Sequence, residues 1–405
     1  MELNRQQMQL KNLNRVSVLN YIRRSKYTTK TALAEDSGLT FMAIQKIVEE
    51  LISLGLVRQD AYQDGHVGRK AVTYTIDENY GYTVGLYINI LKTRAAVMDL
   101  HSNVLSIREC DLCATDDDPA VLADKFINML DAVIEASGVP RARILGVGIG
   151  APGPLSRAEG RIFTPPYFTA LRHMPLKKII SDKLGLPVLV HKDANAVTMG
   201  EYWHGAGVGR SSMIYVDADM GIGSGFIVDG RLYEGANFMA GELGHIIMDP
   251  NGPVCSCGGK GCLDTLASGL RILREFREAV AGRYSGCPDE ITISQVLKAG
   301  GAKDPTAVAI INDAAHMMGL AISTLINIFD PEVIVIGGIL VELYEPYFNI
   351  VKETTLLRKF SGRRENDIIP AMLHNLAGVM GAGEMVADLF FGNLVNEVFA
   401  RSNED

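Results

Sequence analysis

Apolar residues recur at helical spacing near the start of the chain. Val16, Leu19 and Ile22 predict a first helix, because side chains three or four positions apart share one helical face. Thr29 and Thr40 are suited to cap a second and a third helix. The third helix is predicted to bury an apolar face formed by Ile44, Ile47, Val48 and Leu51.

Two strand-like runs follow, at 56–58 and 72–75, and they flank a polar loop at 64–70. With a tight turn at Gly38, this order predicts a winged helix-turn-helix over residues 1–77. The residues expected at a DNA surface are Thr40, Met42, Gln45 and Lys46 on the third helix and Gly68 and Arg69 in the wing. Gln45 is suited to pair with an adenine edge, and Arg69 is suited to enter a minor groove. The alternative is a structural three-helix bundle that binds no nucleic acid.

From position 82 onward, strand-like and helix-like runs alternate, which predicts an α/β fold. The predicted strands are 83–88, 93–100, 104–109 and 144–150, then 211–216, 223–228, 231–233 and 333–336, with helices at 120–137 and 307–327. Because the opening trio of strands occurs twice, we expect two lobes that face a cleft, residues 78–198 and residues 199–405. We expect that the C-terminal helix, although it belongs to the second lobe in sequence, can pack against the first lobe. Ligands of such folds usually lie in the cleft.

Composition and charge agree with a soluble protein that carries a nucleic-acid-binding module. Apolar residues make up 47% of the chain, charged residues 21% and aromatic residues 7%, and the net charge is −8. Residues 1–70 contain eleven Lys and Arg against seven Asp and Glu, so a basic head joins an acidic body. We find no apolar run of membrane-spanning length and no secretory signal, so a cytoplasmic location without membrane contact is expected.

Three cysteines lie within eight residues, shortly after a histidine. His245, Cys255, Cys257 and Cys262 supply one imidazole and three thiols, a complete tetrahedral set for a structural Zn²⁺ ion. The alternative is three buried thiols beside an unrelated histidine. The Cys110–Cys113 pair lies in strand-like sequence, so it is interpreted as structural.

Acidic side chains near predicted strand ends suggest a polyol site. Asp193 and Glu242 are carboxylates that accept hydrogen bonds from sugar hydroxyls. His245 is able to bind zinc through one ring nitrogen and a ligand hydroxyl through the other.

These motifs together resemble the repressor, open reading frame, kinase (ROK) family. The matching segments are 242–245, the cysteine loop through 264, 150–153, 193–195 and 330–338, and the N-terminal module with Gly68 and Arg69 extends the resemblance over nearly the whole chain. The resemblance implies a two-lobed, actin-like and ribonuclease-H-like fold. Family members are sugar kinases or sugar-responsive repressors, and the repressors, of the xylose- and N-acetylglucosamine-repressor type, carry the extra DNA-binding head.

Two loops depart from the kinase pattern. Where kinases have Asp-x-Gly-Gly-Thr, residues 87–91 read Tyr-Ile-Asn-Ile-Leu, and Asp219 opens the second phosphate loop. A carboxylate there repels nucleotide phosphates, so we expect that kinase activity is lost and that the protein is not an enzyme.

The sugar site implied by the resemblance is partly altered. Asp193, Glu242 and His245 match the family, whereas Lys192 replaces an asparagine and Asp264 replaces a glutamate. An acidic, phosphorylated or differently shaped sugar is therefore an alternative to glucose.

The sequence predicts a sugar-responsive transcriptional repressor of carbohydrate genes. Its expected partners are operator DNA, a small carbohydrate effector and further copies of itself, as a homodimer or a dimer of dimers. One alternative is an ATP-dependent sugar kinase with a regulatory head. Another is a repressor controlled by a protein partner, with a vestigial sugar site.

Overall fold

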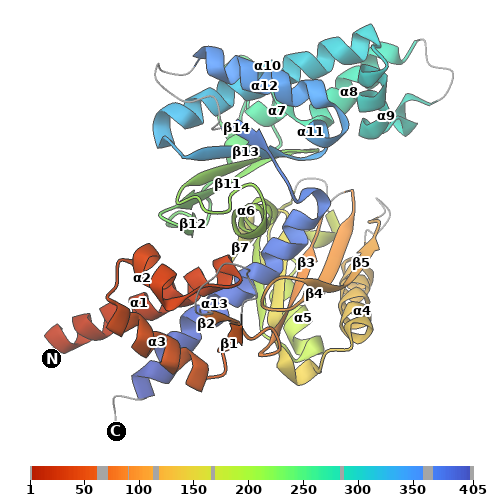
Figure 1. Ribbon diagram of the computed structural model, residues 1–405. Coiled ribbons are helices and arrows are strands. Elements are labelled where there is room, and N and C mark those ends of the chain that lie inside the picture. The colour runs from red at the N-terminus through yellow and green to blue at the C-terminus, as the bar shows by residue number, and fades with distance from the viewer. Residues whose placement is uncertain are drawn as a thin grey trace.

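A computed structural model describes residues 2–61, 72–89, 91–112, 118–165, 169–282, 287–358 and 368–401. The chain forms a small N-terminal unit of helices and a body that contains two five-stranded sheets (Figure 1). The mixed α/β composition agrees with the sequence-based expectation.

The N-terminal unit, called the head below, consists of three helices and an antiparallel hairpin. Its elements are α1 (Glu2–Ser25), α2 (Lys30–Ser37), α3 (Phe41–Ser53), β1 (Val57–Ala61) and β2 (Val72–Ile76). Thr29 and Thr40 cap α2 and α3 through their side chains, and Gly38 has a φ of 68° in the turn between them. The predicted apolar face of α3 is buried against α1 and α2. The wing residues Gly68 and Arg69 lie outside the described residues.

The first sheet of the body comes from the N-terminal half of the chain. Its strands, in spatial order, are β5 (Val104–Cys110), β4 (Thr93–Met98), β3 (Tyr82–Tyr87), β6 (Ile144–Ala151) and β9 (Val188–Lys192). A short hairpin of β7 (Leu155–Ser156) and β8 (Arg161–Ile162) follows β6. Helices α4 (Pro119–Ser137) and α5 (Leu176–Leu184) pack together and share one hydrophobic cluster with this sheet. β4 ends two residues earlier than predicted, because the Asp99 carboxylate accepts hydrogen bonds from the His101 and Asn103 N–H groups and forms a turn.

The second sheet repeats the topology of the first. Its strands, in spatial order, are β12 (Arg231–Tyr233), β11 (Ile222–Val228), β10 (Met213–Ala218), β13 (Val333–Gly337) and β14 (Ile368–Pro370). In both sheets an antiparallel trio of strands is followed by two strands parallel to the first. The helices on its outer side are α7 (Leu263–Ala267), α8 (Gly269–Val280), α9 (Ile293–Gly301), α10 (Pro305–Phe329), α11 (Ile339–Leu343) and α12 (Glu345–Arg358). The repeat predicted from the two strand trios is therefore present.

Contrary to the sequence-based expectation, one helix of the described residues, α10, is long and apolar enough to cross a membrane by length and composition alone. In the structure 56% of its most apolar window is buried. It packs against α7, α8, α9 and α12, so its apolar face belongs to the core beside the second sheet.

Two helices connect the sheets. Helix α6 (Asp193–His204) contacts strands of both sheets, and α13 (Ala377–Arg401) lies along α6 and across β3 and β6 of the first sheet (Figure 1). The helices approach closely at Gly381, where an added Cβ would lie 1.7 Å from the Ala196 carbonyl oxygen. The C-terminal helix thus packs on the sheet formed by the first half of the chain.

Glu201 fixes α6 to the segment that leads into α13. Its buried carboxylate accepts hydrogen bonds from the backbone N–H groups of Ala206, Met372 and Leu373 at 2.7–3.1 Å. Glu201 is fully buried, and a shielded N–H group that loses its partner costs up to roughly 1–3 kcal/mol, so this side chain stabilises three backbone groups.

We predict that Glu201→Ala lowers the free energy of unfolding by roughly 3–5 kcal/mol, because it leaves three partly buried N–H groups unpaired and opens a cavity at a fully buried position. Urea denaturation measures the change. The matched control is Glu135→Ala on the exposed face of α4, for which a change within about 0.5 kcal/mol is expected. Equal effects of the two substitutions would show that the Glu201 contacts are not stabilising.

Candidate functional site

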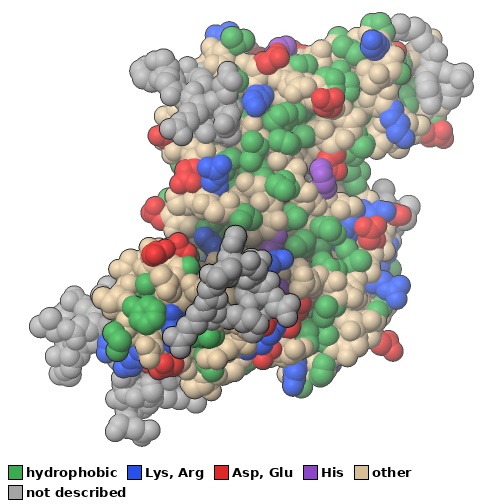
Figure 2. All heavy atoms as spheres, viewed as in Figure 1, with side chains coloured by type: hydrophobic (Ala, Val, Ile, Leu, Met, Phe, Trp, Pro, Cys, Tyr) green, Lys and Arg blue, Asp and Glu red, His purple; other side chains and the backbone are tan. Residues whose placement is uncertain are grey.

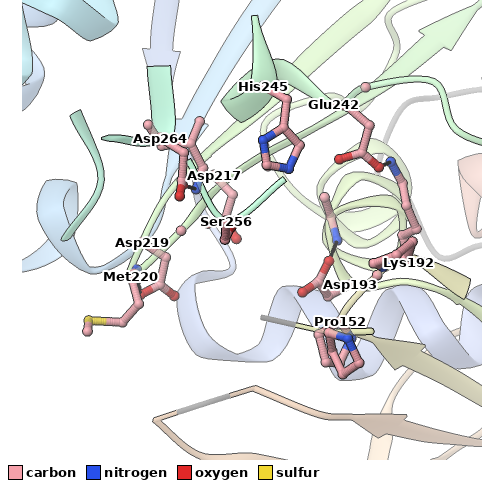
Figure 3. Close-up of a pocket in the computed structure, with 18 of the residues that line it drawn as sticks. Pro152, Lys192, Asp193, Asp217, Asp219, Met220, Glu242, His245, Ser256 and Asp264 are labelled. Atoms are coloured by element: carbon pink, nitrogen blue, oxygen red, sulfur yellow. Dashed lines mark hydrogen bonds and ion pairs between the residues drawn. The ribbon is translucent and has the colours of Figure 1, made fainter. Parts of the chain in front are cut away.

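A cleft of about 600 Å³ opens between the two sheets. It is lined by the ends of β9 and β10, by the turn that begins β11, by the loop after β6 and by the loop after β12 (Figure 3). Ligands of open α/β sheets bind outside the carboxyl ends of the strands, so the cleft has the usual position of a ligand site. Five residues predicted from the sequence line it: Lys192, Asp193, Glu242, His245 and Asp264.

Lys192 points into the cleft and pairs with Glu242. Its Nζ donates hydrogen bonds to Glu242 Oε1 at 2.8 Å and to the Ala240 carbonyl oxygen at 2.7 Å. The lysine is the last residue of β9 in the first sheet and the glutamate follows β12 of the second, so this ion pair joins the two halves of the body. One oxygen of the Glu242 carboxylate is engaged, and Oε2 is left for a ligand hydroxyl.

Asp193 is the first residue of α6. Its carboxylate accepts a hydrogen bond from the Ala194 N–H at 2.7 Å. The pKa of Asp193 is raised to about 6, mainly by burial and also by the carboxylates of Glu242 and Asp219, against the opposing effects of this hydrogen bond and of Lys192. At neutral pH it is an ionised hydrogen-bond acceptor with a proton affinity higher than usual.

The end of β10 adds two carboxylates on the opposite side of the cleft (Figure 3). Asp217 accepts a hydrogen bond from the Tyr215 hydroxyl at 3.3 Å, and Asp219 accepts one from Asn89 Nδ2 at 3.4 Å. Burial raises the pKa of both carboxyls, and repulsion from Asp219 adds to the shift of Asp217. Sequence reasoning missed Asp217, although its position at the carboxyl end of a strand was a usable signal.

Asp264 supports the wall of the cleft. Its Oδ1 accepts a hydrogen bond from the Ile222 N–H at 2.9 Å, which ties the start of α7 to the start of β11. Burial raises the pKa of this carboxyl, opposed by that hydrogen bond and by His245. One of its two oxygens is therefore structural.

The predicted metal ligands come together beside the cleft. The ligand atoms of His245, Cys255, Cys257 and Cys262 all lie within 4.8 Å of one another. The Sγ atoms of Cys257 and Cys262 are 3.7 Å apart, close to the roughly 3.8 Å expected for two thiolates about 2.3 Å from one tetrahedral Zn²⁺. Two buried and two exposed ligands that converge in this way fit a metal ion.

The chain path explains how the ligands converge. Gly261, with a φ of 65°, has no room for a side chain, because an added Cβ would lie 1.5 Å from the Asp249 carbonyl oxygen. His245 Nδ1 lies 3.7 Å from Cys255 Sγ, so its other ring nitrogen, Nε2, is left to face the cleft.

The predicted DNA-contacting residues that the structure describes lie at the start of α3. Met42 is 73% exposed and Lys46 is exposed, whereas Thr40 caps the helix by accepting from the Ala43 N–H. The Gln45 amide donates to Glu49 Oε1 at 3.0 Å, so it would have to change partners to contact a base. Figure 2 shows hydrophobic side chains next to Lys and Arg side chains on the surface of the head, at lower left.

Relatives of known name fall into two groups. A xylose repressor from Caldicellulosiruptor bescii is 29% identical over 384 residues, covering 93% of this chain and 96% of the relative. A glucokinase from Streptomyces coelicolor is 31% identical over 320 residues, covering 76% of this chain and 98% of the relative.

Solved structures show the same division. A ROK family transcriptional regulator, described as a homologue of the Escherichia coli MLC protein, matches with a TM-score of 0.77 at 26% identity and covers 96% of this chain and 99% of its own. A ROK family glucokinase from Streptomyces griseus, in complex with glucose and AMPPNP, matches with a TM-score of 0.67 at 28% identity, over 75% of this chain and 99% of its own. The model of the ROK family matches residues 83–388, well over half of the chain, and the protein therefore belongs to the ROK family.

Proposed function

We propose that the protein is a sugar-responsive transcriptional repressor that has no kinase activity. The observation that carries the proposal is the combination, in one chain, of a head whose third helix has an exposed face and a cleft rich in hydrogen-bond acceptors for a polyol. The xylose repressor and the transcriptional regulator match 93% and 96% of this chain, whereas the glucokinases match about three quarters. Coverage that extends to the head favours the repressors.

The cleft has the chemistry of a carbohydrate site. Asp193, Glu242 Oε2 and the free oxygen of Asp264 are acceptors for hydroxyl donors, and His245 Nε2 adds a further polar contact. Lys192 supplies an ammonium group beside them, which favours a ligand with an electron-rich oxygen at that position. D-Xylose is the first sugar to test, because the relatives named repressors are xylose repressors, and D-glucose is the second.

Zinc is the metal that the Cys₃His set would hold. Bound there, it would fix the cysteine loop and the imidazole ring of His245, and it would take no part in bond making. His245 would be a positioning ligand for zinc through Nδ1 and a sugar contact through Nε2.

Regulation would follow from a shift between two states of a dimer. Sugar would favour a body conformation in which the two heads are spaced poorly for the operator half-sites, so operator DNA would be released. Operator DNA on the chromosome places this activity in the cytoplasm.

The second candidate function is an ATP-dependent sugar kinase with a regulatory head, which the glucokinase relatives favour. Asp217 and Asp219 at the end of β10 argue against kinase activity, because their carboxylates would repel nucleotide phosphates.

We predict that sugar titration releases the protein from operator DNA and that Glu242→Gln removes this response. The glutamine keeps an oxygen that accepts from Lys192 but replaces the acceptor facing the sugar with a donor. Gel-shift titration with D-xylose and D-glucose measures the release. Glu278→Ala, at an exposed position of α8, is the control that should respond as wild type. Normal release from the Glu242→Gln protein would mean that the cleft is not the sensor.

No sugar phosphorylation above background is expected. A coupled assay of ADP release with ATP, D-xylose, D-glucose and N-acetylglucosamine provides the measurement. Turnover at ordinary kinase rates, roughly 1–100 per second, would establish the kinase alternative and refute the proposal.

Zinc should copurify at about one ion per chain. Cys257 is an exposed ligand, so Cys257→Ser removes a thiolate without removing buried apolar surface, and it should lower both the zinc content and the melting temperature. Cys287→Ser, at an exposed cysteine outside the cluster, should change neither. Elemental analysis measures the zinc content, and thermal unfolding measures the melting temperature. Metal-free protein with wild-type stability would refute the zinc site.

Lys46→Ala should weaken operator binding by roughly 1–3 kcal/mol, because the lysine lies on the exposed face of α3. Binding isotherms at several salt concentrations show whether the lost contact was to a base or to a phosphate. Lys183→Ala, an exposed lysine on α5 of the body, should leave operator affinity unchanged. Equal operator affinities of the wild type and the Lys46→Ala protein would exclude this face of α3 as the DNA-binding surface.

A further inference from the structure

We propose that helix α6 couples the cleft to the head. Its first residue, Asp193, lines the cleft. At its other end Tyr202 and Trp203 contact α1 of the head, which also packs on α13, and His204 contacts Glu384 of α13. The inference rests on the proposed function and adds the route by which sugar in the cleft changes the position of the head.

Two arginines of α1 stack on the C-terminal end of α6. The Arg23 and Arg24 guanidinium carbons lie 4.4 and 4.6 Å from the centre of the Trp203 ring. Arg24 also lies 4.7 Å from the centre of the Tyr202 ring and donates a hydrogen bond to the Tyr202 hydroxyl. Stacking of this kind is directional, so it fixes the orientation of α1 relative to α6.

Glu384 of α13 also takes part in this contact between α1 and α6. Its buried carboxylate forms an ion pair with Arg23, lies 3.1 Å from His204 Nε2 and accepts a hydrogen bond from the Ser102 hydroxyl at 3.0 Å. Burial opposes ionisation, but Arg23, His204 and Ser102 lower the pKa of Glu384 to about 2. The carboxylate is therefore charged when the head is docked, and it holds α1, α6 and the turn after β4 together.

Helix α6 is suited to transmit a displacement. Its residues from Ala194 to Trp203 are buried, it spans about 18 Å at 1.5 Å per residue, and the close approach of α13 leaves no room for it to bend. Glu201 bonds three backbone N–H groups around its last turn. A shift of Asp193 on binding sugar would therefore move the helix as a unit and reach Trp203.

The contact between the head and the body leaves some buried hydrogen-bond donors without a partner. Within the part of the chain that the structure describes, Arg23 Nε and Trp203 Nε1 are buried without a hydrogen-bond partner. Both groups would gain water if α1 moved away, and this gain offsets part of the stacking and ion-pair energy. Because these opposing contributions partly cancel, a modest change at the cleft is able to shift the equilibrium between the docked and the undocked head.

Trp203 is the one tryptophan of the chain, and it is 7% exposed, so its fluorescence reports on the contact directly. Titration of the full-length wild type with D-xylose, and with D-glucose as the second probe, should shift the emission over the sugar concentrations that release operator DNA. The Glu242→Gln protein should show no shift, and the Trp203→Phe protein should show no signal.

The decisive variants are Arg24→Ala and the milder Tyr202→Phe, which removes one hydroxyl. In both, sugar affinity measured by calorimetry should stay within about twofold of wild type, while the ratio of operator dissociation constants with and without sugar falls from roughly 5–150 toward one. Arg108→Ala on the exposed edge strand β5 is the control that should keep the wild-type ratio.

The outcomes separate the two proposals. A wild type that does not bind operator DNA, or is not released by either sugar, would refute the proposed function and this inference with it. A responsive wild type, with an unchanged ratio in both variants or a constant Trp203 emission, would refute the coupling through α6 alone.

Discussion

The close packing of α6 against α13 is the constraint on which the rest of the structure depends. Glycines at 200 and 381 let the two backbones approach nearly to contact, since an added Cβ at either position would lie about 2 Å or less from a carbonyl oxygen. One hydrophobic cluster then runs from β3 and β4 of the first sheet through α6 to β10 and β13 of the second. Because both sheets share this cluster, the cleft, the metal ligands and the head are all positioned relative to a single buried helix.

Local sequence patterns predicted the parts of the fold whose determinants are local. The apolar face of α3, the helix at 120–137, the caps Thr29 and Thr40 and the two strand trios have short-range signals, and each appears within about two residues of its predicted position. The Cys₃His set is likewise close in sequence, because its four residues lie within positions 245–262. Local steric and hydrogen-bonding preferences suffice for such features.

Features that depend on distant residues could not be predicted in the same way. Helix α6 is buried on all sides, so its sequence lacks the polar face that marks a surface helix. Arg23 would be read as an exposed basic residue of a DNA-binding head, yet its partner Glu384 lies 361 positions away. The direction of Lys192 also depends on a distant residue, because Glu242 and the Ala240 carbonyl oxygen come from the other half of the chain.

Charge pairs across the cleft explain how a sugar could act on the whole body. Lys192 pairs with Glu242, and Glu234, which follows the second sheet, pairs with Arg157 and His191 from the first half of the chain. These pairs already hold the two halves together without a ligand, so under the proposed function a sugar would not have to bring the halves together. A bound sugar would instead replace hydrogen bonds within these pairs. A sugar hydroxyl that accepts a hydrogen bond from Lys192 would weaken the ion pair between Lys192 and Glu242. Because Lys192 directly precedes Asp193, such an exchange would begin at the first turn of α6.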